Sequence, residues 1–222
     1  MDTRFTGVIP PVITPLLDGR VDLDSLDRLV DMLIGAGVDA LFLLGSSGEA
    51  AYLTDSRREA VVARAVARAD GRVPVLAGAI DTTAPRVIEQ ARRAAAAGAD
   101  AVVATCPFYA LNDAAEIEDH FRAIGAAVDV PLFAYDVPVR LGGARPTADV
   151  LVRLGADGVL AGVKDSSGDD VGLRRLVAAN EAAGHPLALL TGHECVVDGM
   201  LLMGADGVVP GYGNVEPRPY VE

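Results

Sequence analysis

Uncharged runs and amphipathic stretches alternate along the whole chain. The amphipathic stretches repeat apolar residues at helical spacing, as in residues 22–34, where Gly35 and Gly37 then end the predicted helix. The uncharged runs between such stretches predict strands that are buried on both faces. Eight strands are expected, near residues 7–13, 40–44, 73–79, 101–105, 131–135, 158–164, 186–191 and 207–210.

A short repeat marks every second predicted strand. Glycine, a small apolar residue and aspartate stand just before these strands, and the copies begin at Gly37, Gly98, Gly155 and Gly204. A proline opens each of the three strands between them, at positions 74, 131 and 186, where a strand tolerates it. Helices that link purely apolar strands indicate a covered parallel sheet. Eight regular units predict an α/β fold of the (β/α)8 TIM barrel type, with a doubly wound sheet as the alternative.

The sequence stops at Glu222, shortly after the eighth predicted strand. We therefore expect a single barrel domain over residues 1–222 that lacks the eighth helix. An uncovered eighth strand would expose apolar surface. Either the chain is truncated, or a neighbouring molecule covers that flank.

Composition narrows the classes of partner. The formal net charge is −12 and no run of lysine or arginine occurs, which argues against a nucleic-acid binder. No apolar run is long enough to span a membrane, and no signal-peptide pattern follows Met1. The two cysteines, Cys106 and Cys195, form neither a disulfide framework nor a metal-binding spacing. We expect a cytoplasmic protein without nucleic-acid or membrane partners.

The most distinctive chemical feature is Lys164, at the end of the uncharged run 159–163. Apolar surroundings disfavour the ammonium form and lower the pKa of a lysine, which yields a nucleophilic amine. The alternative is an ammonium group that reaches solvent or pairs with Asp165.

Further polar residues follow other predicted strands, at the end of the barrel where such folds place their chemistry. Ser46 and Ser47 lie in a glycine-flanked turn whose hydroxyl and N–H groups suit a carboxylate, although these residues alone favour an ordinary turn before a helix. Tyr135 can shuttle protons and Arg140 can hold a carboxylate. Tyr109 follows another aromatic residue, Phe108, and two adjacent rings more often indicate packing than chemistry.

Two residues after the seventh predicted strand, His193 and Glu194, suggest acid–base work, but a hydrogen-bonded loop histidine is the favoured interpretation. No cluster of histidine, aspartate and glutamate with metal-ligand spacing is present in the sequence. The residue types favour covalent amine chemistry over metal-assisted or nicotinamide chemistry, so neither a metal nor a separate cofactor is expected.

Three motifs together resemble those of a known family. Gly-Ser-Ser-Gly-Glu at 45–49, Tyr-Asp-Val-Pro at 135–138 and Gly-Val-Lys-Asp-Ser-Ser-Gly at 162–168 are similar to motifs of the dihydrodipicolinate synthase / N-acetylneuraminate lyase family of class I, Schiff-base aldolases. The resemblance runs from Phe5 to about Tyr220. It implies a TIM barrel, followed in the family by a small helical domain that is absent here. It also implies a 2-keto acid and an aldehyde as substrates, a covalent lysine–pyruvate imine, and a homo-oligomer, either a dimer or a tetramer.

The resemblance also implies catalytic roles. Lys164 would form the Schiff base with pyruvate or another 2-keto acid. Tyr135 and Ser46 would relay protons, and Tyr109 would complete that relay across a subunit interface.

The implied binding residues are Ser47 and Gly48 for the carboxylate of the keto acid, Arg140 for a carboxylate on the aldehyde, and Val209 for its backbone carbonyl, which faces the site.

Arg140 favours the synthase branch, 4-hydroxy-tetrahydrodipicolinate synthase, in which pyruvate condenses with a carboxylated aldehyde. The alternatives are a 2-keto-3-deoxy sugar acid or N-acetylneuraminate-type aldolase or dehydratase, and a truncated, non-catalytic keto-acid binder. The chain departs from the synthase pattern at Ala110, at Leu141, and at Asp136, where the family usually has asparagine. These departures lie on the side of the second substrate and leave the aldehyde open.

Overall fold

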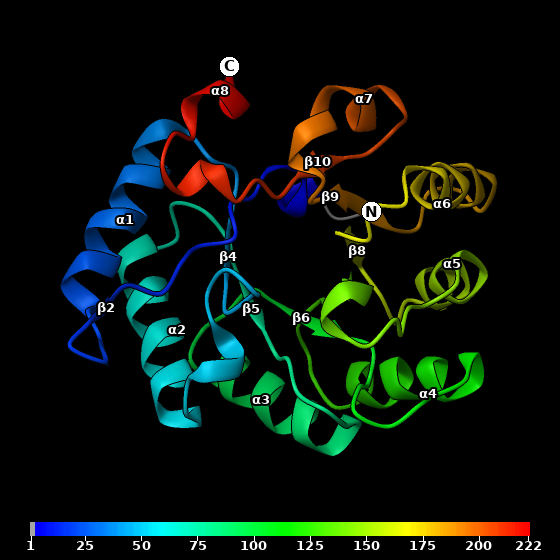
Figure 1. The fold of residues 1–222 in the computed structure, drawn as a ribbon, viewed down its shortest axis with the longest axis horizontal. Helices are drawn as coiled ribbons and strands as arrows, with labels where there is room; N and C mark the ends of the chain where they lie inside the picture. Colours follow the sequence, from blue (N-terminus) through cyan, green and yellow to red (C-terminus); the bar gives the residue numbers. More distant parts are fainter. Residues whose placement is uncertain (1–2) are drawn as a thin grey trace.

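Parallel strands form a closed ring that helices surround on the outside in the computed structural model, which describes residues 3–222 (Figure 1). The sequence predicts no signal peptide after Met1, and Met1 and Asp2 lie outside the described residues. The strand order is β1-β10-β9-β8-β7-β6-β5-β4. A parallel bridge between Pro11 and Phe42 joins the two ends of this order. The ring is therefore the predicted (β/α)8 barrel, and the doubly wound alternative is wrong.

The barrel strands are β1 (Gly7–Val8), β4 (Leu41–Leu43), β5 (Val75–Gly78), β6 (Ala101–Thr105), β7 (Leu132–Asp136), β8 (Gly162–Asp165), β9 (Ala188–Thr191) and β10 (Gly207–Val208). The helices are α1 (Leu23–Ala36), α2 (Asp55–Ala69), α3 (Ala84–Ala96), α4 (Ala114–Gly125), α5 (Ala148–Ala156), α6 (Asp170–Ala182), α7 (Val197–Leu202) and α8 (Arg218–Val221). A separate antiparallel hairpin consists of β2 (Leu16–Leu17) and β3 (Arg20–Val21). The 3-10 turns are η1 (Thr3–Phe5), η2 (Ala50–Tyr52), η3 (Pro138–Arg140), η4 (Glu194–Val196) and η5 (Tyr212–Asn214).

Most strands are shorter than the apolar runs that predict them. β1 ends before Pro10 and Pro11, because a proline has no N–H group to donate to the ladder. β8 begins only at Gly162, because the N–H groups of Val159 and Leu160 both donate to the carbonyl of Leu154 and so close the end of α5. An apolar run therefore marks a strand without marking its ends.

The end of the chain differs from the expectation of no eighth helix. The four-residue α8 follows η5 and lies beside the end of α1 (Figure 1). A Cβ built on Gly37 would meet the side chain of Val221 at 3.3 Å. The short helix therefore packs where α1 ends.

The aspartates of the repeat have a structural function. Three of them accept a backbone N–H from the neighbouring strand, at 2.7 to 2.8 Å. The pairs are Asp39 with Val8, Asp100 with Val75, and Asp206 with Leu189. Each carboxylate satisfies a donor where a strand enters the ring, and so helps to hold the register of adjacent strands. The fourth, Asp157, instead pairs with Arg122.

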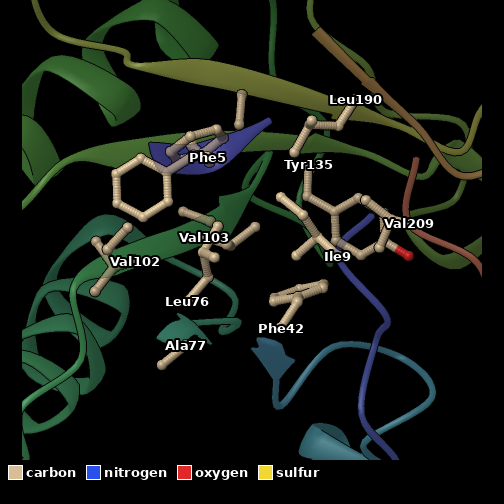
Figure 2. Packing of buried hydrophobic residues seen from close by; sticks show 14 of the residues in the cluster. Phe5, Ile9, Phe42, Leu76, Ala77, Val102, Val103, Tyr135, Leu190 and Val209 are labelled. Carbon is tan, nitrogen blue, oxygen red and sulfur yellow. The ribbon is translucent and has the colours of Figure 1, made fainter. Parts of the chain in front are cut away.

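The inside of the ring is filled by apolar side chains. Ile9, Phe42, Leu76, Val103 and Leu190 point inward from five strands or strand extensions (Figure 2). Such filling makes the barrel a packed core rather than a pore. None of the helices in the described part of the chain is both long and apolar enough to cross a membrane.

Candidate active site

Lys164 is the one charged side chain that lines the small cavity inside the barrel. It is the third of the four residues of β8, so Asp165 rather than Lys164 ends the strand. Its side chain is 6% exposed. The Nζ atom lies 4.3 Å from the ring centre of Tyr135 and 4.7 Å from that of Phe42. Within residues 3–222 the amine forms no hydrogen bond or ion pair, and burial lowers the pKa of Lys164 to about 7.

The alternative pairing of Lys164 with Asp165 is wrong. Successive side chains of a strand point to opposite faces, so the two residues leave β8 in opposite directions. The Asp165 carboxylate accepts the N–H of Ser167 at 2.8 Å and its hydroxyl at 2.7 Å. This turn holds the carboxylate away from the amine, which keeps the amine without a counter-charge.

One signal in the sequence went unused: Lys164 is the only lysine of the chain, and every other basic side chain apart from histidine is an arginine. An arginine stays charged at any physiological pH, whereas a buried lysine can lose its proton. Lys164 is therefore the only side-chain amine that can act as a nucleophile.

Tyr135 lies next to Lys164 in the ring. The two residues are register partners in β7 and β8, and their side chains enter the barrel together. The Tyr135 hydroxyl lies 3.4 Å from the hydroxyl of Ser46, which follows β4. The rings of Tyr135 and Phe42 meet edge to face at 6.2 Å (Figure 2). The structure thus brings together Lys164, Tyr135 and Ser46, as the sequence predicts.

The turn that follows β4, residues 45–50, has a fixed backbone and is called here the β4 turn. Gly48 has no room for a side chain, because a Cβ there would lie 2.9 Å from the backbone nitrogen of Leu44. Its carbonyl accepts the hydroxyl of Thr14 at 2.7 Å. The N–H groups of Ser46, Ser47 and Gly48 donate to no acceptor in the described part of the chain. They are therefore available to an anion from outside.

The other predicted binding residues lie around the mouth of the barrel. Val209 is buried and lines the same cavity as Lys164. Arg140 is exposed at the end of η3 and forms no ion pair among residues 3–222. Both positions fit the predicted roles, which stay predictions.

Tyr109 does not join the site in this chain. It is 99% exposed and has a backbone φ of 81°, a left-handed conformation that a tyrosine rarely adopts. Its neighbour Leu111 is fully exposed as well. The predicted role of Tyr109 across a subunit interface stays a prediction.

His193 and Glu194 both have structural partners. The Nδ1 atom of His193 lies 2.8 Å from a carboxylate oxygen of Asp170. Glu194 accepts the N–H of Gly211 at 3.1 Å and the hydroxyl of Tyr220 at 2.7 Å, and so ties the loop after β10 to α8. Burial and this hydrogen bond raise the pKa of Tyr220 to about 12. These contacts agree with the interpretation of a hydrogen-bonded loop histidine.

An ion pair between a buried carboxylate and a partly exposed arginine lies beside the site and was missed. Asp136, the residue after Tyr135, is buried, and one of its oxygens lies 2.8 Å from Arg145. Its other oxygen has no hydrogen-bond partner within residues 3–222. Burial raises the pKa of Asp136 to about 6, although the Arg145 guanidinium opposes that shift. Arg145 also pairs with Asp169 at 3.0 Å, so it connects the ends of β7 and the loop after β8. Nothing local in the sequence marks Arg145 as the partner.

No group of three or more histidine, cysteine, aspartate or glutamate side chains among residues 3–222 is arranged to hold a metal ion.

Known proteins resemble the chain over nearly its whole length. The sequence matches the dihydrodipicolinate synthetase family over residues 4–222. It is 36% identical over 218 residues to a 4-hydroxy-tetrahydrodipicolinate synthase of Phenylobacterium zucineum, and the matched region covers 98% of this chain and 73% of that protein. It is 34% identical over 215 residues to YagE of Escherichia coli K12, whose name proposes a 2-dehydro-3-deoxy-D-gluconate aldolase, with 96% of this chain and 71% of that one covered.

Two solved structures share the fold. YagE of Escherichia coli K12, in complex with pyruvate, superposes with a TM-score of 0.93 at 34% identity, and covers 98% of this chain and 73% of its own. A dihydrodipicolinate synthase of Acinetobacter baumannii complexed with pyruvate superposes with a TM-score of 0.90 at 30% identity, over 97% of this chain and 73% of its own.

Proposed function

The chain belongs to the dihydrodipicolinate synthetase family and is a lyase of the aldolase kind, and we propose that it acts through an imine between Lys164 and a 2-keto acid such as pyruvate. The observation that carries this proposal is the amine itself. It is buried, has no counter-charge in the described part of the chain, and its pKa is lowered to about 7, so that about half of the molecules carry a neutral amine at neutral pH. Two structurally similar family members were solved in complex with pyruvate.

The first half-reaction forms the imine. The neutral amine of Lys164 attacks the ketone carbon of pyruvate, and the ketone oxygen leaves as water with the two protons of the amine. The hydroxyl of Tyr135, next to that of Ser46, is placed to carry these protons. No separate cofactor takes part in this scheme.

The second half-reaction makes or breaks a carbon–carbon bond. Protonation of the imine nitrogen turns it into an electron sink, so the neighbouring methyl group loses a proton and an enamine forms. The enamine carbon attacks the aldehyde, whose oxygen takes up a proton. Water then hydrolyses the new imine, which releases the product and restores the amine of Lys164. The same steps in reverse cleave an aldol.

The keto acid would be oriented by its carboxylate. The free N–H groups of Ser46, Ser47 and Gly48 in the β4 turn suit that negative charge. A carboxylate held there leaves the ketone to face Lys164, and such orientation accounts for a large share of the rate enhancement of bimolecular reactions.

The second substrate would be a carboxylated aldehyde, held by Arg140, as in a 4-hydroxy-tetrahydrodipicolinate synthase. The guanidinium group is exposed at the mouth of the barrel and has no partner among residues 3–222, which leaves it free for a carboxylate. The second candidate is cleavage of a 2-keto-3-deoxy sugar acid, which the similarity to YagE favours.

The family resemblance and one exposed loop support a homo-oligomer as the working assembly. Tyr109 and Leu111 are both exposed in the loop after β6, and a second subunit that covered them would bring Tyr109 into the proton relay of Tyr135 and Ser46.

The proposed location is the cytoplasm. Its reducing conditions are consistent with the two cysteines, Cys106 and Cys195, which form no disulfide within residues 3–222.

Borohydride trapping with pyruvate tests the imine directly. A folded sample should gain one reduced pyruvate adduct, and peptide mapping should place it on Lys164. Lys164→Ala serves as the control, since that variant retains only the N-terminal amine. A folded wild-type chain that gains no adduct, or gains as much as Lys164→Ala does, would contradict the proposal and favour a non-catalytic keto-acid binder.

A further inference from the structure

Arg58 is a buried cation behind the β4 turn. Its side chain leaves α2, and the residue is 9% exposed. The Nε atom donates to the carbonyl of Ala50 at 2.9 Å, and a terminal nitrogen donates to the carbonyl of Ile80 at 3.2 Å. Among residues 3–222 the guanidinium group forms no ion pair, and both of its hydrogen-bond acceptors are neutral. Its neighbour Arg57 is exposed and has no such contacts.

The two carbonyls belong to different loops at the mouth of the barrel. Ala50 is the last residue of the β4 turn, and its own N–H donates back to Gly45 at the start of that turn. Ile80 belongs to the loop that follows β5. Thr14 holds the turn from another side, through the carbonyl of Gly48. Arg58 therefore fixes one end of the segment whose three N–H groups are free.

The buried charge needs an explanation that its two carbonyl partners do not fully provide. Removing a cation from water is costly, and neutral carbonyl groups offset that cost only in part. Burial opposes the ionisation of nearby Asp81, but its hydrogen bond with Arg86 at 2.7 Å chiefly holds the pKa of that carboxyl below its usual value, and the charge of Arg58 adds only slightly to this effect; Asp81 is therefore the partner of Arg86 rather than of Arg58. A positive charge with little compensation therefore remains behind the β4 turn.

We propose that Arg58 is a positioning residue for the carboxylate of the keto acid. It holds the N–H groups of Ser46, Ser47 and Gly48 in place and supplies positive charge behind them. In a site of low dielectric constant, that charge attracts a carboxylate more strongly than an exposed arginine would. The role rests on the proposed function, because it needs a keto acid bound at this turn.

The test compares Arg58→Met with Arg57→Met, which remove the same charge from adjacent positions of one helix. The readout is the pyruvate concentration that gives half-maximal borohydride-trapped adduct on Lys164, measured by intact mass at constant pH. We expect this concentration to rise about 10- to 100-fold in Arg58→Met, the range for loss of a charge-assisted hydrogen bond, and to stay within twofold of the wild type in Arg57→Met.

Methyl pyruvate separates a loss of charge recognition from a general disturbance of the site. This ester has the same ketone but no carboxylate. The wild type should prefer pyruvate over the ester, and Arg58→Met should lose most of that preference. If Arg58 had a purely structural role, Arg58→Met would weaken the binding of pyruvate and methyl pyruvate equally and would lower the melting temperature, and this outcome would overturn the proposal.

Arg58→Lys provides a second variant in case Arg58→Met does not fold. Lysine keeps the charge but has no planar guanidinium group with which to contact both carbonyls. We therefore expect the half-saturating pyruvate concentration of Arg58→Lys to rise relative to Arg57→Lys, but by less than that of Arg58→Met. The role of Arg58 would be overturned if the Arg58 and Arg57 variants had equal half-saturating pyruvate concentrations and an equal preference for pyruvate over methyl pyruvate. That result would leave the proposed imine on Lys164 unaffected. A wild type without any adduct would overturn the proposed function, and this role with it.

Discussion

Lys164 should react with pyruvate at a rate that rises through about pH 7 and levels off above about pH 8. An ordinary lysine has a pKa near 10.4, so at pH 7 only about one molecule in 2,500 carries a neutral amine. Burial between the rings of Phe42 and Tyr135 lowers the pKa of Lys164 to about 7, and about half of the molecules are then neutral. The structure therefore predicts roughly 10³ times more nucleophile at neutral pH.

The pH profile distinguishes the two cases without any substitution. With a pKa of about 7, the neutral fraction rises about tenfold from pH 6 to pH 8 and only about 1.1-fold from pH 8 to pH 9. With an ordinary pKa it would rise about tenfold for each pH unit across the whole range. The plateau above pH 8 is the diagnostic feature.

The assay mixes the protein with subsaturating pyruvate at each pH, quenches at short intervals with borohydride, and measures the fraction of modified chain by intact mass. Since Lys164 is the only lysine, the adduct reports on one side chain, and Lys164→Ala gives the background from the N-terminal amine. A rate that still climbs about tenfold per unit beyond pH 8 would refute the reasoning, because burial would then not be what activates the amine.

The surroundings of Lys164, Tyr135, Asp136 and Asp39 lead to four further predictions. Lys164→Met should raise the free energy of unfolding by a few kcal/mol at pH 6 and by less at pH 9, because burial penalises the charged amine, which is fully present below its lowered pKa; urea titrations at the two pH values check this. Tyr135→Phe should still form the imine but about 10²- to 10⁴-fold more slowly, as quenched-flow trapping would show, and an unchanged rate would remove Tyr135 from the mechanism. Asp136 has a raised pKa of about 6, so its titration should contribute a loss of up to about 3 kcal/mol of stability as the pH rises from 4 to 6. Asp136→Asn lacks this contribution and should gain stability relative to the wild type between pH 4 and pH 6, and a stability difference that is the same at both pH values would argue against a buried Asp136 charge. Asp39→Ala should cost about 1–3 kcal/mol of unfolding free energy, since it leaves the N–H of Val8 unpaired, whereas a neutral effect in urea would contradict the structural role of the repeat.

The barrel could be predicted because its evidence is local and repeated. Each uncharged run must be buried, and each Gly-x-Asp repeat ends a helix just before a strand. The strand ends could not be predicted from the same runs. Pro10 and Pro11 interrupt the ladder of β1, and Val159 and Leu160 are apolar residues that close the end of α5 instead of extending β8.

The candidate site was predicted in part. Lys164, Tyr135 and Ser46 were found because each stands near the carboxyl end of a strand, and parallel strands place all such ends at the same mouth. The partnerships of Asp136 with Arg145 and of Arg58 with two carbonyls have no local signal. They join loops and helices that meet only after the ring has closed.

Local patterns in the chain are enough to specify eight buried strands, their alternation with helices and a single lysine in apolar surroundings. Folding in three dimensions decides what that lysine meets. The pleat of β8 turns Asp165 outward, and the register with β7 places Tyr135 beside the amine. Closure of the ring through Phe42 adds the second aromatic wall. The reactivity of Lys164 depends on the charge and polarity of the groups around it in space, and those groups come from strands far apart in the sequence.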